Sequence, residues 1–248
     1  MNIVFNIHLE FSRSAVLEGI DAIVQENSKG YVFVVDGNVL ATAARDPMFR
    51  DVVNRASVNI CDGSSIALLA GWIHRNRWTA FPGADLLGDC VGANRFRSFF
   101  LGGTPEVLAS LRKNLSDMDE RVGEMTFMDL PFAGLDEFDY QGIADAINRD
   151  SPDLIWVSLG APKQEWFINR LLPHVRRGVL IAIGAAFNFH SGLECQRRAP
   201  LWMRRLHLEW LYRSMREPRI ARRAVGYLAV LPGIVFAEWR TKRKQECA

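Results

Sequence analysis

The sequence predicts an α/β protein with a doubly wound, mostly parallel β-sheet. Two observations support this class. Short apolar runs rich in β-branched residues alternate with longer segments in which apolar residues recur every three or four positions. The first pattern is typical of strands buried on both faces, and the second of helices that cover those faces. Because ligands of such folds bind at the carboxyl ends of the strands, residues that follow predicted strands are the first candidates for a functional site.

The predicted elements alternate regularly up to about residue 192. The runs that predict strands are 32–35, 58–61, 99–101, 154–159 and 179–183. The segments that predict helices are 14–25, 66–73, 106–115, 140–148 and 163–172. A chain of 248 residues that is 49% hydrophobic can bury one substantial core. We therefore expect one Rossmann-like domain over residues 1–194.

The segment after Gly192 differs from the rest of the chain in pattern and in charge. It contains no strand candidate, and basic helical stretches are predicted at about 200–215 and 219–240. Residues 195–248 hold 13 Lys and Arg against 4 Asp and Glu, whereas residues 1–194 hold 17 against 24. We therefore predict a basic C-terminal helical appendage over 195–248. Its charge favours an anionic partner such as a membrane surface, a phosphate-bearing ligand or nucleic acid.

Two interpretations of this appendage stay open. The stretch 197–213 mixes aromatic residues with arginines at helical spacing, so it either packs on the body or lies in a membrane interface with arginines at a diphosphate. The run 225–237 has 13 uncharged residues interrupted by Pro232 and Gly233, which predicts that it cannot span a bilayer. Nucleic acid is disfavoured as a partner because the aromatic residues form a regular apolar face.

The sequence argues against a zinc site and a disulfide framework, and its first residues indicate where the protein is located. The four cysteines, at positions 61, 90, 195 and 247, are too widely spaced for a zinc site and too few for a disulfide framework. Asp117 and Asp119 are interpreted as solvated loop residues and His190 as structural, so no metal site and no cofactor are expected. Since the chain begins without a basic and apolar leader, a cytoplasmic location is expected.

Two turns in the first half of the chain carry candidate chemistry. In one, Asp36 and Asn38 flank a glycine directly after a predicted strand. In the other, Asp62 and Gly63 follow a strand and precede two serines. A carboxylate at this place can take a proton from an attacking hydroxyl, as a general base does. The alternative for both Asn38 and Asp62 is an ordinary helix cap.

Two later turns are candidates for binding. Gly102 and Gly103 precede Thr-Pro at the start of a helix, where backbone N–H groups can approach a phosphate; the alternative is a plain tight turn. The sequence Gly-Ala-Pro-Lys-Gln-Glu at 160–165 also follows a strand. Its glycine permits close approach of a ligand, and Gln164 and Glu165 can bond ribose or base hydroxyls. The alternative is a capped helix with a solvated first turn.

Together these segments resemble the TagA/WecG/CpsF family of bacterial glycosyltransferases, glycosyltransferase family 26, from about Tyr31 to Ala224. The order and spacing of short blocks carry the resemblance. The blocks are Asn38, Asp62-Gly63, Gly83-Ala84-Asp85-Leu86, Gly102-Gly103, Ser151-Pro152-Asp153, 160–165, Arg198-Ala199-Pro200 and Leu208-Glu209-Trp210-Leu211-Tyr212-Arg213.

The resemblance implies an inverting, metal-independent hexosyltransferase. Such an enzyme moves a sugar from a UDP-sugar to a polyprenyl-diphosphate-linked saccharide in bacterial surface or exopolysaccharide biosynthesis. By position, Asp62 matches the family's general base, Asn38 its active-site asparagine and Gln164 its site glutamine. The resemblance also implies C-terminal helices that meet the inner face of the plasma membrane peripherally, and it is compatible with a homo-oligomer. The residues expected to bind substrate are Asp36, Gly63, Asp85, Gly102, Gly103, Gly160, Pro162, Glu165, Arg198, Arg205, Arg213, Arg216 and Arg223.

Three positions depart from the family's pattern close to the expected site. Asp36 stands where threonine is frequent, Ala80 where arginine is common and Asn188 where aspartate is usual. These departures leave the donor sugar open, although Asp36 suits a hydroxyl-rich neutral sugar better than a uronate.

The hypothesis for the mechanism is a single displacement at the anomeric carbon. Asp62 takes the proton of the acceptor hydroxyl, and arginines of the appendage neutralise the leaving diphosphate in place of a divalent ion. The alternative function is a non-catalytic, membrane-associated nucleotide-sugar-binding or scaffold protein of a polysaccharide assembly complex. It keeps the binding site but needs no base.

Overall fold

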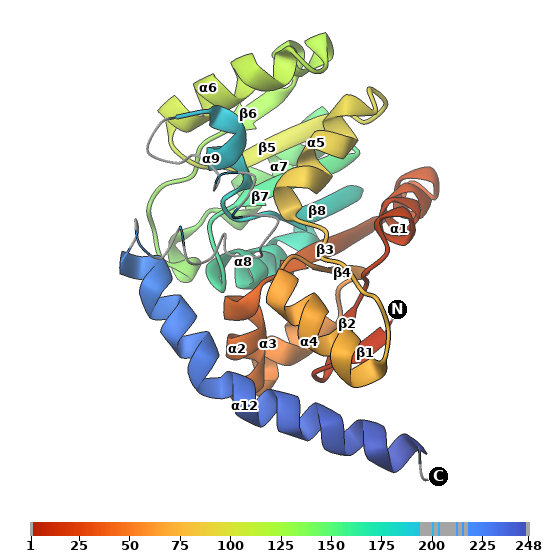
Figure 1. Cartoon of the computed structure of the whole chain (residues 1–248). Helices are drawn as coiled ribbons and strands as arrows, with labels where there is room; N and C mark the ends of the chain where they lie inside the picture. Colours follow the sequence, from red (N-terminus) through yellow and green to blue (C-terminus); the bar gives the residue numbers. More distant parts are fainter. Residues whose placement is uncertain are drawn as a thin grey trace.

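The protein is built around a six-stranded parallel sheet that carries helices on both faces (Figure 1). The computed structural model describes residues 2–193 and 218–246 together with residues 200, 203, 212 and 215. The strand order is β4-β3-β8-β7-β5-β6, and a separate antiparallel hairpin pairs β1 with β2. The sheet strands are β3 (Lys29–Val35), β4 (Val58–Cys61), β5 (Ser98–Gly102), β6 (Thr126–Met128), β7 (Leu154–Ser158) and β8 (Gly178–Ala182); the hairpin strands are β1 (Asn2–Val4) and β2 (Ile7–Leu9).

Two hydrophobic cores lie on opposite faces of the sheet. One packs the hairpin and helices α2, α3, α4, α7 and α8, and the other packs α1, α5, α6 and α9. These helices are α1 (Arg13–Gln25), α2 (Gly37–Arg45), α3 (Pro47–Asn54), α4 (Ser64–His74), α5 (Gly83–Gly92), α6 (Pro105–Ser116), α7 (Tyr140–Asp150), α8 (Lys163–Leu171) and α9 (Ala186–Ser191). Short 3-10 turns are η1 (Glu120–Glu124), η2 (Leu135–Glu137) and η3 (Leu172–His174). The predicted doubly wound class is therefore confirmed.

The sheet register brings separate strand-end turns together. Val35 of β3 is paired with Cys61 of β4, so Asp36 and Asp62 leave neighbouring strands at the same edge. The direction in which successive strands are added reverses between β3 and β8. From β3 the chain continues to β4 on one side of this pair, whereas β8 follows β7, which lies on the other side. Such a reversal opens a crevice above the strand ends, where ligands of doubly wound folds bind.

All five predicted strands and all five predicted helices between residues 14 and 183 are present, with ends shifted by at most three residues. The patterns missed the hairpin, β6, and helices α2, α3, α5 and α9. Each missed strand has only three residues and α9 has six, which is too short to show a period. One interpretation is wrong: Asp119 is buried at 6% exposure and its carboxylate pairs with Arg121 at 2.7 Å, so it is not solvated.

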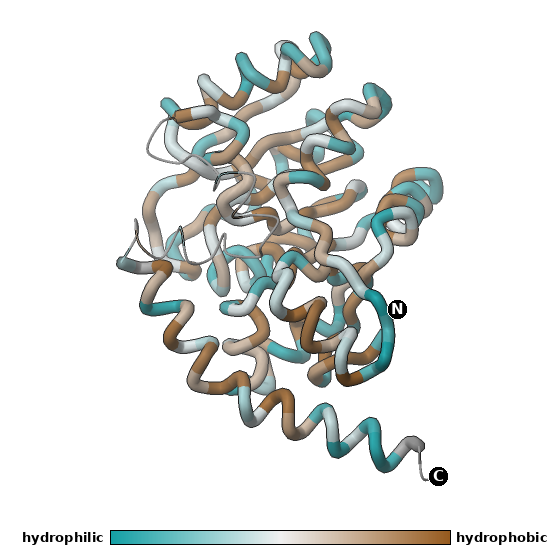
Figure 2. Tube along the Cα trace, in the orientation of Figure 1, coloured by the Kyte–Doolittle hydropathy of each residue, from teal (hydrophilic) through white to brown (hydrophobic). Residues whose placement is uncertain are grey.

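The C-terminal helix α12 (Pro218–Glu246) runs along the outside of the body beside α2 and α4 (Figure 1). It is apolar in its middle and hydrophilic near its C-terminal end (Figure 2). The helix continues through Pro232, which is exposed, so water can reach the carbonyl that proline leaves without a helical partner. By length and composition Ile220–Lys244 can cross a membrane, so the argument from a 13-residue run is wrong. The predicted helix at 200–215 lies almost entirely outside the described residues.

Candidate functional site

A cavity of about 1350 Å³ opens above the carboxyl ends of the sheet strands. Among the described residues, its wall consists of the turns after β3, β4, β5, β7 and β8, the segment 130–132 after β6, and one side of α12. Its volume exceeds the ~300–1,000 Å³ typical of pockets for one small molecule. The cavity therefore has room for a donor and for the head of a second substrate.

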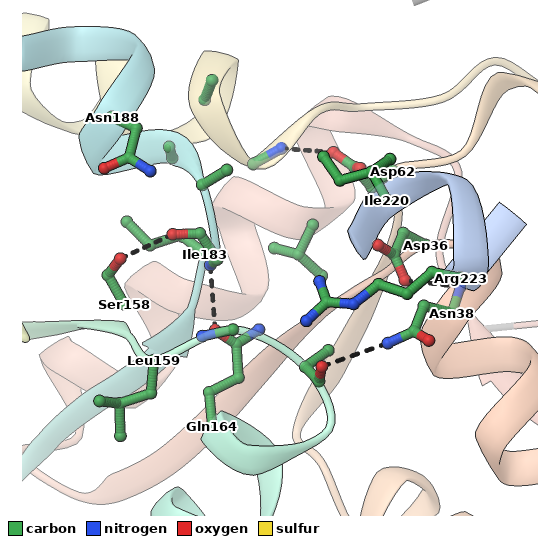
Figure 3. Close-up of a pocket in the computed structure, with 18 of the residues that line it drawn as sticks. Asp36, Asn38, Asp62, Ser158, Leu159, Gln164, Ile183, Asn188, Ile220 and Arg223 are labelled. Carbon is green, nitrogen blue, oxygen red and sulfur yellow. Dashed lines mark hydrogen bonds between the residues drawn. The ribbon is translucent and has the colours of Figure 1, made fainter. Parts of the chain in front are cut away.

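Asp62 presents its carboxylate to this cavity (Figure 3). It follows β4, and its Oδ1 accepts a hydrogen bond from the backbone N–H of Gly83 at 2.9 Å. Gly63, not Asp62, is the N-cap residue of α4, and the cap makes no side-chain hydrogen bond. The alternative interpretation of Asp62 as a helix cap is therefore wrong. The Gly83 N–H holds the carboxylate in place at the cavity wall.

Asp36 and Asn38 have different roles in the turn after β3. Asp36 is the N-cap residue of α2, and its Oδ1 accepts from the N–H groups of Asn38 and Val39, both at 2.9 Å. Asn38 lies inside the helix, and its Nδ2 donates to the carbonyl of Ala161 at 3.2 Å. The capping alternative for Asn38 is wrong. Its amide instead joins the turn after β3 to the turn after β7 (Figure 3).

Gln164 joins the turn after β7 to the turn after β8. Its Oε1 accepts from the backbone N–H of Gly160 at 3.2 Å and from that of Gly184 at 3.1 Å. Both glycines have positive φ, 76° and 53°, a backbone conformation that residues other than glycine rarely adopt. Gln164 is 3% exposed, so the alternative of a solvated first turn of α8 is wrong.

Four of the predicted binding residues do not line the cavity: Asp85, Gly102, Pro162 and Glu165. Glu165 is fully buried, and burial raises the pKa of its carboxyl group to about 7. The hydrogen bond from Gln164 opposes this rise, Asp36 adds to it and Arg223 opposes it. The structure places Glu165 behind the described cavity wall, and its expected hydrogen bond to a ribose or base hydroxyl stays a prediction.

The turn after β5 is built tightly. A Cβ at Gly102 would lie 2.6 Å from the carbonyl oxygen of Ser158, so the two strand ends can approach only because residue 102 is glycine. Gly103 lines the cavity, and Thr104 caps α6 by accepting from the Val107 N–H at 3.3 Å. The side chain of Glu106 in the first turn of α6 also lines the cavity.

Two cations line the described part of the wall. Arg223 reaches from α12 into the cavity beside Asp36 and Asn38 (Figure 3). Lys163 approaches from α8, donates to the carbonyl of Ala133 and lies 4.9 Å from the centre of the Phe138 ring. The sequence singled out Arg223, whereas Lys163 was noted only as part of its turn. Arg198, Arg205, Arg213 and Arg216 lie outside the described residues.

The helix α12 closes one side of the cavity and is held to the body at two places. Near the cavity, Tyr227 packs over Gly37, where a Cβ would lie 3.0 Å from the ring, and Arg45 donates to the Gly226 carbonyl at 2.7 Å. Farther along, the buried Glu238 accepts from the Phe5 N–H and faces His74 Nε2, both at 2.7 Å.

Several lining residues carry no local signal in the sequence. Tyr227 and Phe132 reach the cavity because the chain returns to it from distant segments, whereas Ser158 is the last residue of β7. Phe132 is fully exposed, and Ser158 donates to the Gly184 carbonyl at 2.7 Å. His190, interpreted as structural, bonds the Ala84 carbonyl at 2.8 Å.

Comparison with known proteins identifies the relatives of this chain. A family model described as the glycosyl transferase WecG/TagA/CpsF family matches residues 3–246. The chain is 28% identical over 209 residues to an N-acetylglucosaminyldiphosphoundecaprenol N-acetyl-beta-D-mannosaminyltransferase of Bacillus spizizenii, covering 82% of this chain and 77% of the relative. A protein of the same name from Staphylococcus aureus is 24% identical over 237 residues, covering 92% of this chain and 88% of the relative.

Proposed function

Because the chain belongs to the WecG/TagA/CpsF family of glycosyl transferases, we propose that its cavity transfers a sugar from a UDP-sugar to a polyprenyl-diphosphate-linked saccharide. The relatives from Bacillus and Staphylococcus are named for transfer of N-acetyl-mannosamine onto a diphosphoundecaprenol-linked N-acetylglucosamine, which supports a lipid-linked acceptor. The observation that carries the proposal is the carboxylate of Asp62, fixed by the Gly83 N–H at the wall of a cavity with room for both substrates.

The proposed reaction is a single displacement. The acceptor hydroxyl oxygen attacks the anomeric carbon, the bond from that carbon to the UDP oxygen breaks, and UDP leaves with the electron pair. Asp62 takes the hydroxyl proton, and the configuration at the anomeric carbon inverts. Asn38 and Gln164 support the site by holding the turns around it, since each makes hydrogen bonds to backbone groups of neighbouring turns.

The leaving diphosphate needs positive charge. We assign this role to Arg223 and Lys163, together with the arginines of residues 195–217, and extend the proposal to catalysis without a bound metal.

The proposed location is the inner face of the plasma membrane, with residues 195–248 as a membrane-associating appendage. The outward side of α12 exposes Val225, Leu228, Phe236 and Trp239, and the cations Arg240 and Arg243 follow near its end. An apolar stripe with flanking cations is typical of a helix that lies in an anionic interface. Glu238 favours this arrangement over a span, because a carboxylate in hydrocarbon is costly and here it is satisfied by the body.

The test is a donor screen. The protein is incubated with a panel of UDP-sugars and a short-chain lipid diphosphate that carries N-acetylglucosamine, and products are identified by mass spectrometry. A lipid product heavier by one sugar residue, formed with release of UDP, supports the proposal. Binding of a UDP-sugar without any product or UDP release would instead favour the non-catalytic scaffold function.

A further inference from the structure

Glu165 is a buried carboxyl group outside the proposed chemistry. Its side chain is fully buried, and its Oε1 accepts a hydrogen bond from Gln164 Nε2 at 3.0 Å. Its other oxygen, Oε2, has no hydrogen-bond partner among the described residues. Burying a carboxyl group with an unsatisfied oxygen is costly, and an apolar residue would avoid that cost. The position therefore indicates a role that an apolar residue cannot fill.

The neighbour of Glu165 shows what that role is. An amide side chain has one acceptor end and one donor end, and the two ends of Gln164 face different partners. The acceptor end receives the N–H groups of Gly160 and Gly184, and the donor end faces Glu165. A carboxyl oxygen on that side gives the amide nitrogen an acceptor, so all three bonds form only in one orientation of the amide.

The two glycine N–H groups belong to the turns that form the cavity floor. Gly160 follows β7 and Gly184 follows β8, which are adjacent in the sheet, and Asn38 bonds the carbonyl next to Gly160 from the turn after β3. Arg223 lies close to the same turn, because a Cβ at Gly160 would be 4.0 Å from its Nη2. The position of one glutamine amide therefore affects three strand ends at the site where the donor is proposed to react.

We propose that Glu165 is a positioning residue for glycosyl transfer, which holds the amide of Gln164 so that the turns after β7 and β8 keep the geometry of the cavity floor. This inference rests on the proposed function of the cavity. The charged groups that act on the buried carboxyl are Asp36 after β3 and Arg223 of α12. Its raised pKa, about 7, agrees with a carboxyl group kept at this place against the cost of burial.

The experiment compares E165Q with E165M. Glutamine keeps an oxygen that can accept from Gln164, whereas methionine fills a similar volume without a good acceptor. We expect E165M to lower kcat by about fivefold, as loss of one hydrogen bond does, and E165Q to stay within twofold of the unaltered protein. Amide hydrogen exchange of Gly160 and Gly184, followed by nuclear magnetic resonance, reports positioning directly. Protection of both amides should fall in E165M and persist in E165Q.

A matched control separates positioning from stability. Leu171 is fully buried on the same helix but lies about two turns beyond Gln164. L171A should lower the free energy of unfolding while leaving kcat and the protection of Gly160 and Gly184 unchanged. Unchanged kcat and protection in a folded E165M would overturn the proposal, as would an E165Q variant as impaired as E165M.

The proposal can still be tested if E165M does not fold or if the unaltered protein transfers no sugar. If E165M does not fold, E165L, which also removes the acceptor for Gln164 Nε2, takes its place. Loss of protection at both amides in E165L supports the proposal, and unchanged protection in it overturns the proposal. If the unaltered protein transfers no sugar from any donor, the proposed function fails, whereas the exchange measurements still test the positioning role.

Discussion

The turns after β4 and β7 place polar side chains at the same cavity but use them differently. Both follow a buried strand, contain glycine and open a helix. In the turn after β4, the Asp62 carboxylate lines the cavity and accepts one backbone N–H. In the turn after β7, Gln164 bonds two backbone N–H groups and Glu165. The difference teaches that similar strand-end motifs can place one polar side chain at the cavity and use another to hold neighbouring turns.

The surroundings of each turn explain this division. Above β4 the carboxylate of Asp62 accepts from the Gly83 N–H and lies at the cavity. Above β7 the turn after β8 lies directly opposite, and its Gly184 N–H needs an acceptor. We therefore expect variants of the first turn to affect the chemical step and variants of the second to affect geometry and stability.

The largest effect is expected at Asp62. Asp62→Asn keeps an oxygen for the Gly83 N–H but cannot take a proton, so turnover should fall by roughly 10²-fold or more. Steady-state UDP release with a lipid acceptor measures the loss, and thermal unfolding checks the fold. Asp51→Asn, an exposed change on α3, is the matched control and should leave turnover unchanged. A folded Asp62→Asn variant with near-normal turnover removes Asp62 as the base.

The second largest effect is expected at Gln164. Gln164→Leu leaves the N–H groups of Gly160 and Gly184 without their acceptor, which should lower stability by about 1–3 kcal/mol. Displaced turns should also lower kcat by about 10- to 100-fold. Urea unfolding and kinetics measure the two effects. If Gln164→Leu changes kcat as much as Asp62→Asn but leaves stability unaltered, the contrast between the two turns is wrong.

A smaller effect is expected where α12 meets the cavity. Arg223→Ala removes a cation beside Asp36 and should raise the KM for the UDP-sugar about tenfold, as loss of a charge-assisted hydrogen bond does. Arg222→Ala changes an exposed neighbour that does not line the cavity and is the control. Equal KM values for the two variants would show that Arg223 does not bind the donor.

The smallest effect on turnover is expected from the ionisation of Glu165. Its effect appears instead in how the free energy of unfolding depends on pH. Its pKa is raised from 4.5 to about 7, so the folded protein retains this proton after the unfolded chain has lost it. The group's contribution to the free energy of unfolding is fully present below pH 4.5 and is lost as pH rises through 7. The free energy of unfolding should therefore decline over that window relative to E165Q. If the free energy of unfolding depends on pH in the same way in both proteins, the pKa of Glu165 is not raised.

Much of this protein could be predicted from local pattern. The parallel sheet follows from apolar runs that alternate with helical periods, since each pattern reports burial of neighbouring residues along the chain. The place of the site follows as well, because parallel strand ends share one edge, and Asp36, Asn38, Asp62 and Gln164 do lie at the same cavity. The resemblance of ordered blocks indicated a family that the comparison then confirmed.

Only the tertiary structure decided what each polar side chain does. The sequence alone could not show that Asp36 caps α2 while Asn38 bonds Ala161, because that partner lies 123 residues away. Nor could it show that Glu238 is held by Phe5, 233 residues earlier, which docks α12 on the body. Periodicity records whether a residue is buried, but a hydrogen bond depends on which distant backbone group arrives opposite it. The sequence by itself therefore determined the fold and the sheet edge that carries the candidate site, whereas packing between distant segments decided which residues face the cavity and which hold the turns.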